Sequence, residues 1–266
     1  MNIFRNIVFW ASLVVVVCGS VYFFNVCKKY TRHCHNCSVQ KKNQIIESKK
    51  VSEKNESSVN KEDKLRIPIR SAQMWSNMPQ KIKDTVVQVI SQKAIFNFIQ
   101  PYKTPKMGEG AGSAFFISSD GYLITNAHVV DQAKAVWLRI PSLGKKIIDA
   151  QVVCFAPERD LALIKVKPDG IEEIKKQIGS IPYLCLGDSD KVCRADEVMA
   201  LGYPLGQTAL KSTTGIISGR EHINNQHLIQ MSAPINPGSS GGPVLNVEGE
   251  VIGISSAGIF GGAQNV

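Results

Sequence analysis

From residue 85 onward, the sequence consists of short apolar runs separated by glycine, proline, asparagine and aspartate. This pattern constrains the fold more than any other feature, because brief β-rich runs with turn residues between them are typical of β-strands. No long helical pattern alternates with the runs, which argues against a parallel α/β sheet. We therefore predict an all-β barrel or sandwich. The expected strands are Thr85–Ser91, Gly112–Ser118, Tyr122–Thr125, Ala135–Ile140, Ile147–Phe155, Leu161–Val166, Glu197–Gly202, Thr213–Gly219, Leu228–Ser232, Pro243–Val247 and Val251–Ser256.

A polar break near residues 170–182 divides these strands into two groups. The break contains the segment Ile171–Ile178, whose sequence IEEIKKQI favours a helix. A second short helix is expected at Met74–Lys83, before the first strand. The division predicts two packed barrels, barrel one over about residues 80–170 and barrel two over about residues 182–266.

The N-terminal region contains an 18-residue run without a charge, Ile7–Phe24. As a helix it is roughly 27 Å long, close to the ~30 Å hydrocarbon thickness of a bilayer. A cleaved signal peptide is the alternative, but its apolar core is shorter and ends in small residues, whereas Cys18-Gly19-Ser20 lies inside this run. We predict an uncleaved membrane anchor over residues 1–27. Its orientation is weakly specified, because the Lys/Arg excess after the run favours a cytoplasmic remainder while long domains translocate regardless.

Residues 28–70 form a juxtamembrane segment followed by a basic tether. Cys27 and the sequence His33-Cys34-His35-Asn36-Cys37 could bind zinc or copper. No second cysteine pair stands at zinc-finger spacing, so disulfide-linked or acylated thiols are the alternative that we favour. The stretch from Ser38 to Arg66 has many charges of both signs and little apolar content, which predicts a disordered tether.

The positive charge of the chain lies almost entirely in its N-terminal part. The net charge is +9, and residues 1–70, with 13 Lys/Arg and 5 Asp/Glu, account for +8. Residues 71–266 carry 18 Lys/Arg and 17 Asp/Glu, a net charge of +1. A nucleic-acid-binding face on the folded part would need a charge excess that is absent there, so we expect no nucleic-acid partner.

The segment Asn236-Pro237-Gly238-Ser239-Ser240-Gly241-Gly242-Pro243 lies between two apolar strands and is therefore a tight turn within a fold. A serine nucleophile needs such a turn, because glycines allow neighbouring backbone N–H groups to converge on a developing oxyanion. Without this context, a stretch rich in glycine and serine would read as a flexible loop.

A serine nucleophile also needs a base, and His128 is the best placed histidine. It follows the strand ending Ile124-Thr125 and is flanked by apolar residues, whereas His222 and His227 are expected in a polar loop, REHINNQH, as solvated surface residues. An apolar-flanked histidine is more often structural than catalytic. Asp160 changes this balance, because a half-buried carboxylate at the start of an apolar strand needs a partner such as an imidazole.

The motifs ITNAHVV, RDLALIKV and INPGSSGGPV, in the order His, Asp, Ser, resemble those of the HtrA/Deg proteases of the trypsin-like serine peptidases. GSAFFISSDGYLIT, LGDSD, ALGYPLGQ, TTGIISG and VIGISSAGI extend the resemblance over about residues 80–266. It implies a chymotrypsin-like double β-barrel with the active site between the barrels. Ser239 stands where family members carry asparagine, a residue that tolerates unusual backbone angles better.

The resemblance assigns roles to individual residues. Ser240 is the expected nucleophile, His128 the general base and then acid, and Asp160 the residue that orients His128. The backbone N–H groups of Gly238 and Ser240 would form the oxyanion hole, and the expected substrate-binding residues are Pro234, Ile254, Ser255 and Ser256. Pro234 replaces the acidic pocket base of trypsin-like enzymes, so we expect cleavage after small or medium aliphatic residues.

The resemblance also implies partners and a location. We expect a serine endopeptidase that acts on unfolded or damaged proteins, uses no metal or cofactor, and is tethered to a membrane through residues 7–24. Its catalytic domain is expected on the extracytoplasmic, periplasmic side. The resemblance to the family also suggests a homotrimer as its assembly. The alternative function is a proteolytically inactive peptide-binding or chaperone module. We further expect the last strand of barrel two to be missing, because relatives continue beyond the position of Val266.

Overall fold

The computed structural model describes residues 75, 78, 82–95, 99–100, 102, 104, 106–223 and 226–256. The expected membrane anchor, the Cys27–Cys37 segment and the tether lie outside these residues, and so does the chain after residue 256. Among the described residues, no helix is both long and apolar enough to cross a bilayer. The anchor therefore stays a prediction.

Strands dominate the described part of the chain, which confirms the all-β prediction. The strands are β1 (Val86–Ile95), β2 (Lys106–Phe116), β3 (Tyr122–Thr125), β4 (Ala133–Arg139), β5 (Ile147–Ala156), β6 (Leu161–Val166), β7 (Glu197–Gly202), β8 (Lys211–Ile223), β9 (Gln226–Met231), β10 (Pro243–Leu245) and β11 (Val251–Ile254). The helical segments are α3 (Ala127–Val130), α4 (Pro168–Ile178), and the 3₁₀ turns η1 (Pro141–Leu143), η2 (Pro157–Arg159), η3 (Ser189–Lys191) and η4 (Pro204–Gly206).

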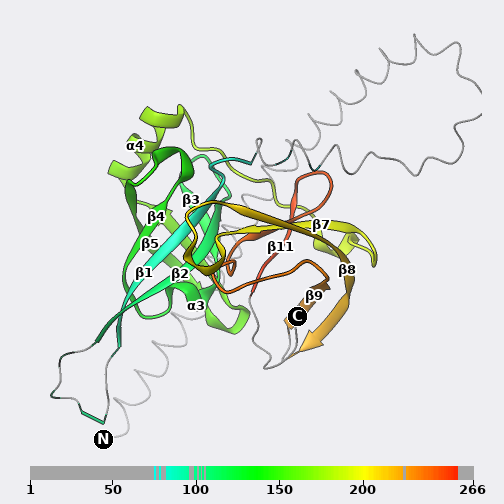
Figure 1. The fold of residues 1–266 in the computed structure, drawn as a ribbon, viewed down its shortest axis with the longest axis horizontal. Coiled ribbons are helices and arrows are strands. Elements are labelled where there is room, and N and C mark those ends of the chain that lie inside the picture. The colour runs from blue at the N-terminus through cyan, green and yellow to red at the C-terminus, as the bar shows by residue number, and fades with distance from the viewer. Residues whose placement is uncertain are drawn as a thin grey trace, which may run out of the picture.

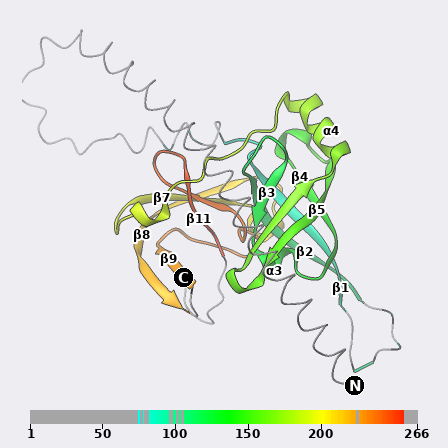
Figure 2. The same cartoon turned by 180° about the vertical axis from the view of Figure 1, so that it is seen from behind.

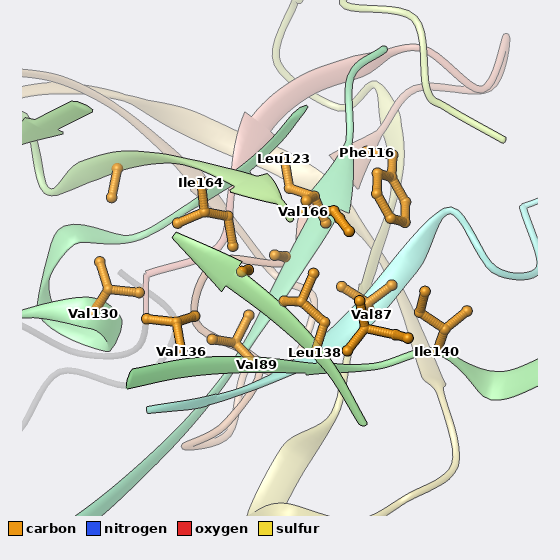
Figure 3. Close-up of a cluster of buried hydrophobic side chains, with 14 of the residues drawn as sticks. Val87, Val89, Phe116, Leu123, Val130, Val136, Leu138, Ile140, Ile164 and Val166 are labelled. Carbon is orange, nitrogen blue, oxygen red and sulfur yellow. The ribbon is translucent and has the colours of Figure 1, made fainter. Parts of the chain in front are cut away.

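The first six strands form a closed barrel in the order β1-β2-β3-β6-β5-β4 (Figure 1). The antiparallel pairing of β1 with β4, from Gln88↔Arg139 to Lys93↔Ala133, closes it. Because successive side chains of a strand point to opposite faces, alternate apolar residues fill the interior. Figure 3 shows this core, in which Val87, Leu138 and Ile164 are buried.

The remaining strands form a five-stranded sheet in the order β11-β10-β7-β8-β9, beside the barrel (Figure 2). Its order repeats that of the barrel, with β7 to β11 in the places of β1 to β5. The place of β6 has no counterpart in the residues that the structure describes. The two units pack through a shared apolar cluster that includes Phe115, Leu163, Leu201 and Leu245.

The predicted boundaries hold best where apolar runs are short and sharply bounded. Strands β3, β6 and β7 match the prediction residue for residue. Helix α4 begins three residues earlier than expected, because Pro168 suits the first turn of a helix. Of the predicted helix before β1, Trp75 and Met78 have helical backbone conformation, and the other residues up to 81 are not described.

The prediction of a polar loop around His222 and His227 was wrong. Strands β8 and β9 form a hairpin there, with His222 opposite His227 and their ring centroids 4.5 Å apart. Polar residues on both faces hide the strand alternation that would have identified the hairpin, because an exposed ribbon has no buried face. Both histidines are exposed, as expected.

Candidate active site

His128 and Asp160 come together at one end of the closed barrel. His128 lies in α3, directly after β3, and Asp160 follows the turn η2 and precedes β6. The Nδ1 atom of His128 is 2.8 Å from Oδ2 and 3.0 Å from Oδ1 of Asp160. The backbone N–H of His128 also donates to Oδ1, at 3.0 Å. A carboxylate only accepts hydrogen bonds, so Nδ1 carries the proton and Nε2 is left as a base.

Two further side chains hold Asp160, and the sequence did not identify either role. The hydroxyl of Ser256 donates to Oδ2 at 3.0 Å, and the amide of Asn126 donates to the Asp160 carbonyl at 2.9 Å. Asp160 itself adopts the left-handed conformation, with φ 50° and ψ 42°. Burial would raise the pKa of Asp160, but the hydrogen bonds from His128 and Ser256 outweigh it and lower the pKa below its usual value. Asp160 is therefore an anion over the physiological range.

Ser240 lies in the turn between β9 and β10 and is buried. Gly238 and Gly241 have positive φ values of 96° and 86°. A side chain at Gly238 would bring its Cβ to 2.5 Å from the Tyr203 carbonyl, and one at Gly241 would collide with the backbone of β2. Ser239 is absent from the positive-φ residues, so serine in place of asparagine imposes no left-handed strain here. Gly238 and Gly241 supply the positive φ angles of this turn.

The turn is tied to both halves of the molecule. The Ser240 carbonyl accepts a hydrogen bond from the N–H of Ser113 on β2, at 2.8 Å. The Pro237 carbonyl accepts one from the N–H of Leu205 in η4, at 2.7 Å. Because the N–H of a trans peptide points opposite to its C=O, the N–H of Gly238 points away from η4.

Strand β2 also brings the histidine and serine segments together. Gly112 lies between them, because a Cβ there would contact the Val129 side chain and stand 3.2 Å from the Ser240 carbonyl. Val129 is the residue after His128. The segments that contain His128 and Ser240 therefore approach each other at Gly112 of β2.

Two of the expected substrate-binding residues, Ser255 and Pro234, make hydrogen bonds within the second half of the molecule. Ser255 clamps the serine turn: its hydroxyl is 2.7 Å from the Ser239 carbonyl, its N–H donates to Gly242, and its carbonyl accepts from Gly241. Pro234 is exposed, and its carbonyl accepts from the Thr213 hydroxyl at 3.0 Å.

Ile254 and Ser256, together with Ser255, line a cavity of about 570 Å³ beside the second sheet. Apolar residues Ile235, Val244 and Ile252 form part of its wall. Arg220, Glu221 and Asp190 line it as well, so this cavity carries charges that the sequence did not predict. Among the described residues, no group of three or more His, Cys, Asp or Glu side chains is arranged to hold a metal ion.

Comparisons with known proteins find peptidases with similar sequence and fold. The family model for the trypsin-like peptidase domain matches residues 112–254, more than half of the chain. Two curated relatives bear the name DegP-like periplasmic serine endoprotease. The protein from Chlamydia pneumoniae is 39% identical over 155 residues, which is 56% of this chain and 29% of the relative. The protein from Pseudomonas putida is 40% identical over 152 residues, again 56% and 29%. The chain thus spans less than a third of the length of these relatives.

Solved structures of the HtrA-type protease AlgW have the same fold. The structure with a decapeptide has a TM-score of 0.56 at 27% sequence identity, and the match covers 72% of this chain and 61% of that one. The structure with a tripeptide has a TM-score of 0.57 at 28% identity, with 72% and 56% covered.

Proposed function

Because the chain belongs to the trypsin-like peptidase domain family, we propose that it is a serine endopeptidase that uses Ser240, His128 and Asp160 as a catalytic triad. The observation that carries this proposal is the double contact of Asp160 with the ring and the backbone N–H of His128. A purely structural ion pair would not require this orientation of the ring beside a glycine-rich serine turn.

In the proposed mechanism, Nε2 of His128 takes the proton of the Ser240 hydroxyl while Oγ forms a bond to the carbonyl carbon of the scissile peptide. The negative charge moves to the carbonyl oxygen, which the N–H groups of Gly238 and Ser240 stabilise. His128 then gives its proton to the leaving amine, and the C–N bond breaks. Water hydrolyses the resulting acyl-enzyme by the same steps, and Asp160 stabilises the imidazolium each time.

The proposed substrates are unfolded or damaged proteins, cut after small or medium aliphatic residues. The apolar wall formed by Ile235, Val244, Ile252 and Ile254 supports this preference, since a Lys or Arg side chain would lose hydration there. Mass-spectrometric mapping of cut sites in denatured casein tests it. Predominant cleavage after Lys or Arg would instead assign a recognition role to Glu221 or Asp190 in the same cavity.

We further propose that the domain is tethered to a membrane by residues 7–24 and faces the periplasm, with a trimer as its assembly. The uncharged run and the periplasmic naming of the curated relatives support this location. Carbonate extraction tests the anchor, protease shaving of spheroplasts tests the side, and light scattering of detergent-solubilised protein tests the assembly. A carbonate-soluble protein would contradict the anchor.

The decisive experiment compares the full chain with its Ser240→Ala and His128→Ala variants. Each should lower the turnover of fluorescein-labelled casein by about 10⁴- to 10⁶-fold, because triad residues act as a unit. His222→Ala is the matched histidine control, because His222 is exposed and does not line the 570 Å³ cavity, and it should leave turnover within about twofold. Undiminished cleavage by the Ser240→Ala protein contradicts the proposal. Peptide binding without hydrolysis by the unaltered chain would favour the inactive binding module.

A further inference from the structure

Ser113 makes an unusually large set of hydrogen bonds for one buried residue. Its N–H donates to the Ser240 carbonyl at 2.8 Å, and its carbonyl accepts from the Thr125 hydroxyl at 2.7 Å. Its own hydroxyl donates to the Gly238 carbonyl at 2.8 Å and accepts from the Tyr203 N–H at 3.0 Å. Ser113 has no solvent exposure. It therefore touches both the nucleophile turn and the strand that leads to the histidine.

The hydroxyl of Ser113 makes both of its side-chain contacts. A hydroxyl donates and accepts at once, so it satisfies the Gly238 carbonyl and the Tyr203 N–H together. Alanine would leave the buried Tyr203 N–H and the part-buried Gly238 carbonyl without this partner, which is costly. The space is also tight, since a Cβ added at Gly202 would stand 3.0 Å from the Ser113 Oγ.

Tyr203, whose N–H donates to the Ser113 hydroxyl, is itself held in place by the closed barrel. Its side chain is buried, and its hydroxyl donates to the Val86 carbonyl on β1 at 3.0 Å. Burial, together with the nearby charge of Asp84, raises the pKa of Tyr203, so the hydroxyl remains a donor. The Tyr203 N–H is therefore held rigidly opposite Ser113.

The two carbonyls that flank Gly238 are consequently both held. Leu205 donates to the carbonyl of Pro237 at 2.7 Å, and the Ser113 hydroxyl donates to the carbonyl of Gly238 at 2.8 Å. The Leu205 contact orients the Pro237–Gly238 peptide, which carries the Gly238 N–H, and the Ser113 contact orients the next peptide, so rotation about both backbone bonds of Gly238 is restricted. Gly238 needs this support, because its φ of 96° is one of many backbone angles that glycine adopts readily.

We infer that the Ser113 hydroxyl is a positioning group that preorganises the Gly238 N–H as an oxyanion-hole donor. This inference rests on the proposed peptidase function and adds a residue of the closed barrel to its machinery. Ser113 touches no reacting atom; it acts through the turn. Removing one oxyanion donor outright lowers kcat by about 10²- to 10³-fold. Loosening the donor should therefore cost less.

The test compares the full chain with Ser113→Ala and with a matched control, Thr85→Val. Thr85 is also a buried hydroxyl of the first unit, and it donates to the Ile82 carbonyl away from the turn. Ser113→Ala should lower kcat on labelled casein about 10- to 100-fold with KM nearly unchanged, because the contact acts in the transition state. Thr85→Val should leave both constants within about twofold.

A second readout separates positioning from stability. A peptide boronate with a C-terminal aliphatic residue forms a tetrahedral adduct with Ser240, so its affinity should fall in parallel with kcat/KM in Ser113→Ala. Ser113→Cys, which retains a weak donor, should recover part of both losses and replaces Ser113→Ala if the latter does not fold.

Three outcomes overturn the inference: unchanged kcat in Ser113→Ala, an equal loss in Thr85→Val, or unchanged boronate affinity. Failure of the proposed function itself is recognised separately, since Ser240→Ala would then remain active. In that case the turn is not the site of catalysis, and the Ser113 contact serves packing only.

Discussion

The two halves of the molecule differ in how their sheets end. The first six strands close into a barrel, so every strand has two neighbours, whereas the second sheet leaves β9 and β11 at its edges within the described residues. Among the described residues, the barrel core contains 17 buried apolar residues and the core of the second sheet contains seven. Closure removes unpaired edges and buries side chains from all sides, so the first half is expected to be the more rigid.

The proposed catalytic residues are distributed unevenly over these halves. His128 and Asp160 belong to the closed barrel, while Ser240 lies in a turn of the open sheet. The Ser113 contacts join that turn to the barrel. The proposed nucleophile therefore lies in the half with open sheet edges among the described residues, and its turn is held by contacts from the closed barrel.

The largest expected effect concerns the orientation of His128 by the barrel. Asp160→Asn should lower kcat by about 10⁴-fold, because the amide favours the wrong imidazole tautomer. Asp149→Asn is the matched control: it makes the same chemical change at an exposed position of β5, where Asp149 lies 3.4 Å from Lys167. Casein turnover measures both. Comparable losses would mean that the barrel's charge, and not this contact, governs activity.

The next largest effect is the loss of unfolding free energy when one isoleucine in each core is shortened to alanine. Ile164→Ala in the barrel and Ile252→Ala in the second sheet remove the same atoms from buried sites. Such changes cost about 2–5 kcal/mol, with the larger values where the surroundings cannot relax. Ile164 should lie near the upper end. Ile252 should lie near the lower end, because it already borders the 570 Å³ cavity. Urea unfolding measures the loss of unfolding free energy in each variant. An equal or larger loss for Ile252→Ala would contradict the expected difference between the two cores.

Hydrogen exchange should resolve the same contrast strand by strand. Amides of β9 and β11 should exchange faster than amides of β1 and β2, because edge strands open without disrupting a closed ladder. Native-state exchange followed by mass spectrometry gives the protection of each segment. Uniform protection across both halves would show that the second sheet has neighbours outside the described residues.

The smallest effect is the pH dependence that Asp160 contributes to stability. The pKa of Asp160 is lowered in the folded protein. The stability that its ionised carboxylate contributes is therefore fully present above the pKa of the unfolded chain, about 3.9, and is lost as the pH falls through the pKa of the folded protein. The unfolding free energies of the unaltered protein and of Asp160→Asn should therefore differ more at pH 7 than at pH 3. A difference that grows on acidification would contradict the assigned direction.

Much of the fold follows from local sequence. The runs YLIT, LALIKV and EVMALG fix β3, β6 and β7, because short apolar stretches between turn residues leave few other conformations. The Gly-rich motif likewise identified the turn at Ser240, since Gly238 and Gly241 adopt angles that other residues avoid. Local chemistry encodes these features, and a single sequence therefore suffices to find them.

Contacts between distant segments were decided only by the tertiary structure. Ser256 was expected to line the substrate, yet its hydroxyl reaches Asp160, 96 positions earlier in the chain. Ser113 carried no signal of its own, and its hydroxyl meets Gly238 across 125 positions. Serine is compatible with surface, turn and core alike, so its role depends on which backbone groups barrel closure places beside it. The sequence by itself determined the short, sharply bounded strands and the turn and identified the proposed reactive side chains, while sheet packing decided which polar groups contact them.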